Sequence, residues 1–144
     1  MKTTKTNNIL TLAIKTKGIG FINITDILNE KLNSIADSSN GILHLFVMHT
    51  SCALAISEAF DPSARLDLEK FMDHLAPTNL SFIKHTSEGR DDSPSHMKSL
   101  LLHQSLATIV SEGEILLGRW QGIFLCEFRE DGANREIILK FCAD

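Results

Sequence analysis

The sequence predicts an α+β domain that combines antiparallel hairpins with at least three helices. Two observations lead to this prediction. Several short segments alternate apolar and polar residues and are separated by turn residues, as strands are. At least three other segments carry apolar residues at helical spacing. No internal repeat or linker divides the 144 residues, so we expect a single domain over residues 1–144 that is large enough to bury a core.

The first half of the chain contains two predicted strands and one ambiguous segment. Residues 9–15 alternate as a strand does, and a short extended piece begins at Phe21. Residues 42–48 form a nearly unbroken apolar run, which predicts a strand buried on both faces. Residues 49–60 remain ambiguous, because their alanines and leucine favour a helix by propensity alone.

Three helices are predicted, over residues 25–36, over residues 61–77 and after Ser93. In the third, Ser93 is expected to be the N-cap and Pro94 the first helical residue. Helical spacing marks the residues that should face the core. In chain order they are Ile27, Leu28, Leu32 and Ile35, then Ala64, Leu68, Phe71, Met72 and Leu75, then Met97, Leu100, Leu101 and Gln104.

The end of the chain is predicted to be extended. Residues 106–110 form one strand, and residues 121–129 alternate as a second. In this second strand Phe124, Cys126 and Phe128 face one way, and Ile123, Leu125, Glu127 and Arg129 face the other. A turn at residues 131–132 leads into a strand over residues 135–142, which predicts a C-terminal hairpin.

Composition excludes several classes of function. The formal net charge is −4 and no Lys/Arg cluster occurs, so a nucleic-acid surface is not expected, although a local anion site is compatible with this charge. No apolar run is long enough to cross a bilayer, and the N-terminus lacks the apolar core of a signal peptide. Cys52, Cys126 and Cys142 are odd in number and have no paired spacing. We therefore expect free thiols and a cytoplasmic protein without membrane contact.

The loop over residues 85–98 concentrates residues that bind metals. His85 and His96 lie there together with Glu88, Asp91 and Asp92. Imidazole and carboxylate are the usual ligands of zinc and related ions, but this spacing matches no diagnostic metal motif. A carboxylate could instead orient a ligand histidine through its second ring nitrogen. The alternative is a solvated, capped loop in which basic residues pair the acids.

A second candidate group is His49-Thr50-Ser51, directly after the apolar run of residues 42–48. His49 could be a third metal ligand or a general base near neutral pH. The hydroxyls of Thr50 and Ser51 suit phosphate oxygens; equally, they could cap local backbone groups in a turn. Nucleophilic chemistry by Cys52 is a weaker hypothesis, because neighbouring residues of a strand face opposite ways and nothing nearby lowers the pKa of the thiol.

Four strings of residues together resemble the YjbQ family, also called the secondary thiamine-phosphate synthase family. They are His49-Thr-Ser-Cys-Ala-Leu, Ser57-Glu-Ala-Phe-Asp-Pro62, the loop over residues 85–98, and Gly118-Arg-Trp-Gln-Gly-Ile123 with Glu127. The resemblance covers about residues 5–141. It implies a compact α+β fold with a β-sandwich-like sheet, a homotrimer, a metal pocket near subunit contacts, and a secondary thiamine-phosphate synthase activity. It also implies a strand rather than a helix over residues 52–58.

The resemblance places His49, His85 and His96 on the histidines of the family, and Asp92 and Glu127 on its acidic positions. We therefore expect a divalent ion, zinc with magnesium as the alternative, on the three histidines. Catalytic roles are expected for His49, Asp92 and Glu127, and contacts with the phosphate of a small metabolite for Thr50, Ser51 and Arg129. The competing hypotheses are a non-catalytic protein that binds a metal or phosphometabolite, and a loop that merely builds an oligomer interface. Cys52, Ser57 and Arg119 depart from the commoner residues of the family.

Overall fold

The computed structural model describes residues 9–144. Residues 1–8, the N-terminal segment in which we expect no signal peptide, lie outside the described residues. Eight strands and three helices follow one another in the described part of the chain. They are β1 (Ile9–Lys15), β2 (Gly20–Asn23), α1 (Thr25–Ala36), β3 (Gly41–Val47), β4 (Cys52–Glu58), α2 (Pro62–Leu75), α3 (Asp92–Leu101), β5 (Ser105–Ser111), β6 (Glu114–Ile115), β7 (Gln121–Glu127) and β8 (Asn134–Ala143). The predicted α+β class is confirmed. No helix within residues 9–144 has the length and apolar character that a bilayer crossing requires.

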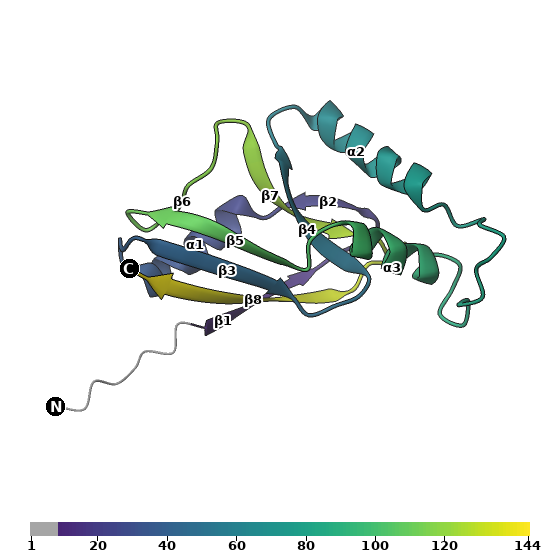
Figure 1. The fold of residues 1–144 in the computed structure, drawn as a ribbon, viewed down its shortest axis with the longest axis horizontal. Helices are drawn as coiled ribbons and strands as arrows, with labels where there is room; N and C mark the ends of the chain where they lie inside the picture. Colours follow the sequence, from purple (N-terminus) through teal and green to yellow (C-terminus); the bar gives the residue numbers. More distant parts are fainter. Residues whose placement is uncertain (1–8) are drawn as a thin grey trace.

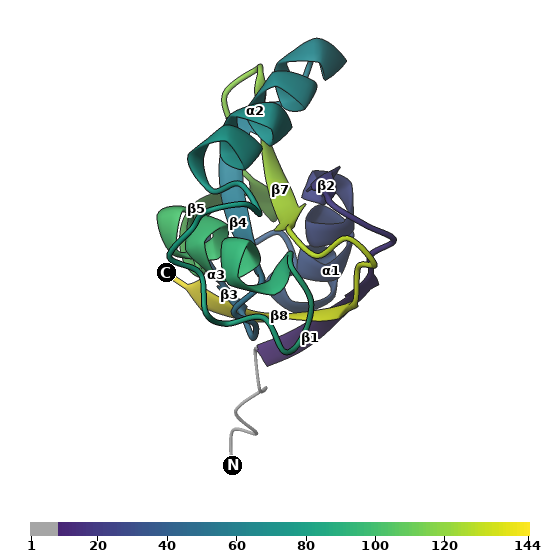
Figure 2. The same cartoon turned by 90° about the vertical axis from the view of Figure 1, so that its right-hand side faces the viewer.

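The strands form two antiparallel sheets that lie one over the other (Figures 1 and 2). The large sheet has the order β1-β8-β3-β5-β6 and the small sheet the order β2-β7-β4. Helix α1 lies beside the small sheet and covers the same face of the large one. Helix α2 extends away from the rest of the molecule, and α3 crosses the end of the sheets at which β3 passes into β4 (Figure 1). The predicted sandwich-like arrangement is therefore present.

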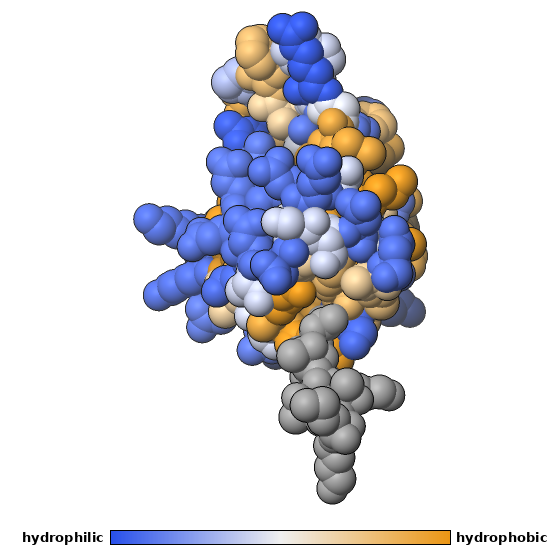
Figure 3. All heavy atoms as spheres, turned by 90° about the vertical axis from the view of Figure 1, so that its left-hand side faces the viewer, coloured by the Kyte–Doolittle hydropathy of each residue, from blue (hydrophilic) through white to orange (hydrophobic). Residues whose placement is uncertain are grey.

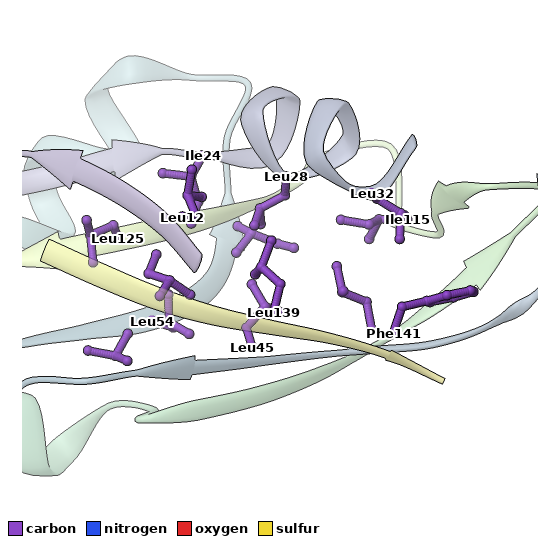
Figure 4. Close-up of a cluster of buried hydrophobic side chains, with 14 of the residues drawn as sticks. Leu12, Ile24, Leu28, Leu32, Leu45, Leu54, Ile115, Leu125, Leu139 and Phe141 are labelled. Atoms are coloured by element: carbon purple, nitrogen blue, oxygen red, sulfur yellow. The ribbon is translucent and has the colours of Figure 1, made fainter. Parts of the chain in front are cut away.

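The main core lies between the large sheet on one side and α1 with the small sheet on the other. Leu28 of α1 points toward Leu139 and Leu45 of the large sheet, and Leu32, one turn further along, lies beside Ile115 (Figure 4). The leucine side chains are fully buried, and each contributes about 1.5–3 kcal/mol through removal of apolar surface from water. Ile27, which was expected to face this core, is 38% exposed, because Leu28 and Leu32 define the contact line of the helix.

The small sheet is buried on both faces, which explains why β4 is a strand. Its alternate residues belong to different cores: Leu54 and Leu125 pack in the main core, whereas Ala55 and Phe124 pack under α2 in a second one. The pairing of β4 with β7 supplies the hydrogen bonds that a helix would otherwise form internally. Pairing with β7 thus overrides the helix propensity of residues 52–58. The alternation of faces predicted for residues 121–129 is confirmed by β7.

The prediction that residues 42–48 are buried on both faces is wrong. Leu43, Leu45 and Val47 are buried, but the alternate residues between them are exposed. The exposed apolar residues of this outer face are Ile42, Phe46 and Met48, with Ile109 of β5 paired opposite Ile42. Within residues 9–144, no helix lies in front of β3 and β5 on this side of the large sheet (Figure 1). Apolar residues gather along the right-hand edge of the molecule in Figure 3, which corresponds to the front of Figure 1.

The predicted C-terminal hairpin is also wrong, although the turn that should form it exists. Strand β7 belongs to the small sheet and β8 to the large one, so the link between them changes sheets. Gly132 in this link has φ of 67°, and a Cβ atom there would lie 2.5 Å from the carbonyl oxygen of Thr16. Only glycine accepts this backbone conformation and this close approach without strain.

Helix α3 buries other residues than its apolar periodicity predicts, and α2 follows the prediction only in part. On α2 Met72 is buried and Ala64 and Leu68 are half-buried, whereas Phe71 and Leu75 are 54% and 46% exposed. On α3 the inner face is polar: it buries Ser95, Lys98 and Ser99 and leaves Leu100 and Leu101 exposed. The hydroxyl of Ser99 donates to the carbonyl oxygen of Cys52 at 2.7 Å. Hydrogen bonds to β4 therefore orient α3, and periodicity does not reveal them.

A buried ion pair joins the two sheets at one end of the main core. The carboxylate of Glu127 on β7 is fully buried and accepts hydrogen bonds from Nε of Arg135 on β8 at 2.9 Å and from the backbone N–H of Phe128 at 3.0 Å. The hydroxyl of Thr16, just after β1, donates to the same carboxylate. The group is buried but saturated with partners, which is the condition under which a buried charge is tolerated.

Replacing Glu127 by Leu should lower the free energy of unfolding by about 3–5 kcal/mol, because the Arg135 guanidinium would stay buried without its counter-charge. The double variant Glu127→Leu/Arg135→Met should regain most of that loss. Urea unfolding of the wild type and of the two variants measures both quantities. A single variant as stable as the wild type would show that the pair does not hold the sheets together.

Candidate metal centre

Two histidines and an aspartate meet where the loop after α2 enters α3. Nε2 of His85 lies 2.8 Å from Oδ2 of Asp92, and Nε2 of His96 lies 3.3 Å from Oδ1 of the same carboxylate. The two imidazole rings are 5.4 Å apart between centroids. Each residue offers one ligand atom, and the three atoms lie within 4.8 Å of one another. We call this group the HDH cluster.

The start of α3 brings Asp92 and His96 onto one face. The helix begins at Asp92, with Asp91 as its N-cap residue, so the predicted cap at Ser93 and first helical residue at Pro94 lie too far along the chain. Asp92 and His96 are consequently four residues apart within the helix, a spacing at which side chains are neighbours. His85 reaches the same carboxylate from the preceding loop, so the cluster depends on the path of that loop.

The contacts of His96 define which of its nitrogens can bind a metal. Nδ1 lies 2.8 Å from the carbonyl oxygen of Thr50. A carbonyl oxygen only accepts, so Nδ1 carries the proton, and the lone pair of the neutral ring lies on Nε2. Nε2 is the atom that faces Asp92 and His85. A backbone carbonyl that holds the second nitrogen of a histidine in this way is typical of metal ligands.

Arg129 fixes the acidic side of the cluster. Its Nε donates to Oδ2 of Asp91 at 3.0 Å, its Nη1 donates to Oδ1 of Asp92, and its Nη2 donates to the carbonyl oxygen of Glu88 at 2.7 Å. These contacts use three of the five N–H groups of a guanidinium. Arg129, expected to bind phosphate, is therefore first of all the partner of the two aspartates.

Asp91 stands behind the cluster and is held ionised. Burial alone would raise the pKa of its carboxyl, but hydrogen bonds from backbone N–H groups, including that of Glu130 at 2.9 Å, and the charge of Arg129 together lower the pKa. A permanently charged Asp91 secures Arg129, and Arg129 in turn fixes the orientation of Asp92. Asp92 itself is 4% exposed.

The donor set of the HDH cluster fits a small divalent ion. Bonds of about 2.0–2.2 Å to a tetrahedral ion place its ligand atoms roughly 3.3–3.6 Å apart. Nε2 of His85 lies 2.8 Å from Oδ2 of Asp92, and the three ligand atoms lie within 4.8 Å of one another, so small side-chain movements bring them to that spacing. Arg129 occupies Oδ1 of Asp92, which leaves Oδ2 for an ion. The side chains of His85 and His96 are 55% and 36% exposed, so a fourth position would face solvent. Three protein ligands with an open position are the pattern of catalytic rather than structural zinc.

His49, expected as a third histidine ligand, is not in the HDH cluster. Its Nε2 accepts a hydrogen bond from the backbone N–H of Glu136 at 2.8 Å. Burial, followed by the nearby charge of Arg135, lowers the pKa of His49. The ring is therefore neutral, and it is hydrogen-bonded to the backbone of β8. This contact is structural and replaces the metal bond that was expected for His49.

The segment over residues 49–51 does meet the cluster, but through its backbone. The carbonyl of Thr50 accepts from His96, and the carbonyl of Ser51 accepts from Nη2 of Arg135 at 3.3 Å. The two segments, distant in sequence, therefore contact each other through backbone carbonyls, which residue types alone do not reveal. Arg135 could have been suspected from the sequence, because it shares a strand face with Ile137 and Leu139 and so points into the core.

Two further expectations are corrected by burial. Glu127 is fully buried in its ion pair and cannot touch a substrate, so its expected catalytic role gives way to a structural one. Cys52 is buried, and burial raises the pKa of its thiol to about 12. A thiol of that pKa is not a nucleophile near neutral pH, so the hypothesis of cysteine chemistry is excluded.

Comparison with known proteins assigns the same family along nearly the whole chain. The family model described as UPF0047 protein YjbQ-like matches residues 10–144. The UPF0047 protein YjbQ of Escherichia coli O157:H7 is 44% identical over 131 residues, which cover 89% of this chain and 92% of that protein. The UPF0047 protein YjbQ of Salmonella typhimurium is 41% identical over 128 residues, with the same coverage of both chains.

Solved structures show the same fold. The chain is similar to a conserved hypothetical protein from Thermus thermophilus, with a TM-score of 0.83 and 34% identity over 92% of this chain and 99% of that one. It is also similar to an uncharacterized YjbQ/UPF0047 protein from Clostridium acetobutylicum, with a TM-score of 0.82 and 29% identity over the same shares. The names of these proteins state no activity, so the chemistry must be argued from the site.

The lowered pKa of His49 predicts how stability depends on pH. The unfolded histidine takes up a proton near pH 6.5, whereas the folded one resists protonation until a lower pH. The unfolded state therefore binds more protons in this window, and stability should fall as the pH drops below about 6.5. In the variant His49→Gln, which keeps an acceptor for Glu136 but does not titrate, the fall should be smaller. Urea midpoints between about pH 7.5 and pH 5.5, measured with EDTA present, test this; parallel curves would contradict it.

Proposed function

The chain belongs to the YjbQ family, and we propose that it is a metal-dependent enzyme that acts on small phosphorylated metabolites. The observation that carries this proposal is the HDH cluster, in which the Thr50 carbonyl holds His96 in the tautomer that leaves Nε2 free. His85, Asp92 and His96 are the proposed ligands. They leave one side of the ion open to solvent, where a substrate oxygen can bind.

Zinc is the proposed ion and magnesium the alternative. Two imidazoles with one carboxylate suit zinc, whereas magnesium prefers oxygen ligands and retains most of its waters. When bound, such an ion acts as a Lewis acid that stabilises negative charge on a phosphate oxygen. Asp92 would contribute one oxygen to the ion while Arg129 holds the other, so the carboxylate cannot rotate away.

The proposed secondary reaction is the synthesis of thiamine phosphate. The ring nitrogen of thiazole phosphate forms a bond to the methylene carbon of the pyrimidine pyrophosphate, and the carbon–oxygen bond to pyrophosphate breaks with its electron pair. The protein therefore has to stabilise charge on the leaving pyrophosphate. Thr50 and Ser51 are the proposed hydroxyl donors, because their backbone lies against His96 and Arg135 respectively. Arg129 keeps two N–H groups, the five of a guanidinium less the three in use, for an oxyanion.

A non-catalytic role is the second proposal: the same cluster could hold a metal or a phosphometabolite without turnover. The exposed, shallow setting of the cluster favours it, since an open site excludes little water from a reaction. Turnover assays separate the two proposals, because a binding protein would take up metal and phosphometabolite without releasing pyrophosphate. The free thiols of Cys52, Cys126 and Cys142 support a reducing, cytoplasmic setting for either role.

We also propose a homotrimer. The outer face of the large sheet supports self-association, because Ile42, Phe46, Met48 and Ile109 are 42%, 49%, 51% and 62% exposed there. Large apolar side chains that gather on one exposed face mark association surfaces in soluble proteins. The number of subunits follows from the family resemblance.

Replacing His96 by Ala should remove stoichiometric zinc and, if the protein is an enzyme, thiamine-phosphate formation. The variant loses one of three ligands, and the two that remain bind a divalent ion far more weakly. Metal content of tag-free protein and pyrophosphate release from the two precursors are the measurements. His74→Ala, at an exposed position near the end of α2, is the matched control and should keep both properties. Full zinc occupancy in His96→Ala would refute the ligand assignment.

The variant Phe46→Glu should disrupt the assembly, since it introduces a charge into the outer apolar face. Light scattering after gel filtration should give the mass of three 16.0 kDa chains for the wild type and a smaller mass for the variant. Phe82→Glu is the control, because Phe82 is 66% exposed in the loop after α2, away from that face. A Phe46→Glu protein with unchanged mass would rule this face out as the contact.

A further inference from the structure

A second cavity lies behind the HDH cluster and contains a buried lysine. It has a volume of about 270 Å³ and is bounded by the end of α2, by α3 and by the link between β7 and β8. Its polar lining comprises Asp73, Thr78, Arg90, Asp91, Lys98 and Glu130. The side chain of Lys98 is 4% exposed, although its ammonium group reaches this cavity.

The ammonium of Lys98 has fewer partners than its burial demands. It donates to the carboxylate of Asp73, whose side chain is 60% exposed, and lies 5.7 Å from the centroid of the Phe128 ring. An ammonium has three N–H donors, and an ion pair with an exposed carboxylate is weak because solvent screens it. The burial of a charge is costly unless strong partners surround it. Lys98 therefore has the capacity to bind another anion.

The other charges of the cavity are already paired. Asp91 accepts from Arg129 and from the backbone N–H of Glu130. Glu130 makes a long 3.4 Å contact with Arg90, whose side chain is 76% exposed and free to turn. Asp91 is thus neutralised by Arg129, whereas Arg90 is held only by its long contact with Glu130 and can turn toward a ligand. The charges that a ligand would meet are therefore the cations of Lys98 and Arg90 and the carboxylates of Asp73 and Glu130. A ligand with two negative charges would compete with Asp73 for the ammonium.

We propose that Lys98 forms a binding site for a phosphate-type oxyanion of a small molecule, with Arg90 and Thr78 as further donors. The ligand replaces the Asp73 carboxylate at the ammonium, so Lys98 is never left unpaired. A phosphate fits this site because the lysine ammonium attracts it as a point charge and an arginine can donate hydrogen bonds to two of its oxygens. The cavity has room for a phosphate and a short organic group, but for no macromolecule.

This site is separate from the proposed metal centre. Asp91 lines the cavity, Asp92 belongs to the HDH cluster, and the guanidinium of Arg129 stands between the two carboxylates. The oxyanion site therefore does not require a metal ion, and its test can be made on metal-free protein. Failure of one proposal leaves the other standing.

Titration calorimetry of EDTA-treated full-length protein tests the site with inorganic pyrophosphate and with glycerol 3-phosphate, each compared with acetate. Asp73→Asn should tighten the binding of both phosphates about fivefold, the factor that loss of a competing exposed ion pair allows. Lys98→Met should abolish binding, whereas Lys70→Met, at an exposed position on α2, should leave it unchanged. His96→Ala should also bind normally. Preference for glycerol 3-phosphate over pyrophosphate would identify the phosphate of an organic metabolite, and the reverse would identify an inorganic oxyanion.

The opposite results would overturn the proposal. If Lys98–Asp73 is merely a structural ion pair, Asp73→Asn should lower the melting temperature and leave phosphate binding unchanged. If binding disappears in His96→Ala, the phosphate sits at the HDH cluster and not at Lys98. Should Lys98→Met fail to fold, Arg90→Gln replaces it: weaker binding in that variant together with tighter binding in Asp73→Asn supports the site, and unchanged binding in both refutes it.

Discussion

The buried carboxylate of Glu127 is the constraint on which the rest of the structure depends. It lies at the end of the main core, where β7 of the small sheet meets β8 of the large one. A carboxylate at this depth is tolerable only with all its partners present, and Arg135, Thr16 and the backbone of Phe128 supply them. Thr16 follows β1, Arg135 lies on β8, and Phe128 is the residue next to Glu127 in the chain. Because loss of any one of these hydrogen bonds would leave the buried carboxylate short of a partner, together they hold the two sheets to each other at this end.

The same constraint positions the HDH cluster from two sides. Arg135 donates to the Ser51 carbonyl, and the adjacent Thr50 carbonyl holds His96. Two residues beyond Glu127, Arg129 reaches out to Asp91 and Asp92. The residues of the HDH cluster thus lie on a loop and at the start of a helix, but the contacts that hold them lead back to the ends of β7 and β8. A site supported in this way keeps its geometry even though two of its side chains face solvent.

Most helices and strands, and the residues of the HDH cluster, can be predicted from the sequence, because they depend on local patterns. Alternation predicts β1 and the two faces of β7, and the density of ligand-type residues singles out His85, Asp92 and His96. The sequence does not reveal which strand or helix each element pairs with or packs against. Sheet membership of β8 depends on pairing with β1 and β3, which lie near the opposite end of the chain. The polar inner face of α3 likewise depends on acceptors that β4 provides, such as the carbonyl of Cys52.

That polar inner face also explains where the apolar residues of α3 go. Since Ser95, Lys98 and Ser99 face the interior, Leu100 must point outward, and it is 84% exposed. Leu100 lines an open depression together with Thr50 and His96, and a neighbouring depression is lined by Phe46 and Met48 of the outer face. The exposed apolar residues of the outer face and the HDH cluster therefore adjoin. Self-association through the outer face would cover Leu100 as well, and would lower the access of water to the open side of the cluster, where an exposed metal centre is otherwise weakest.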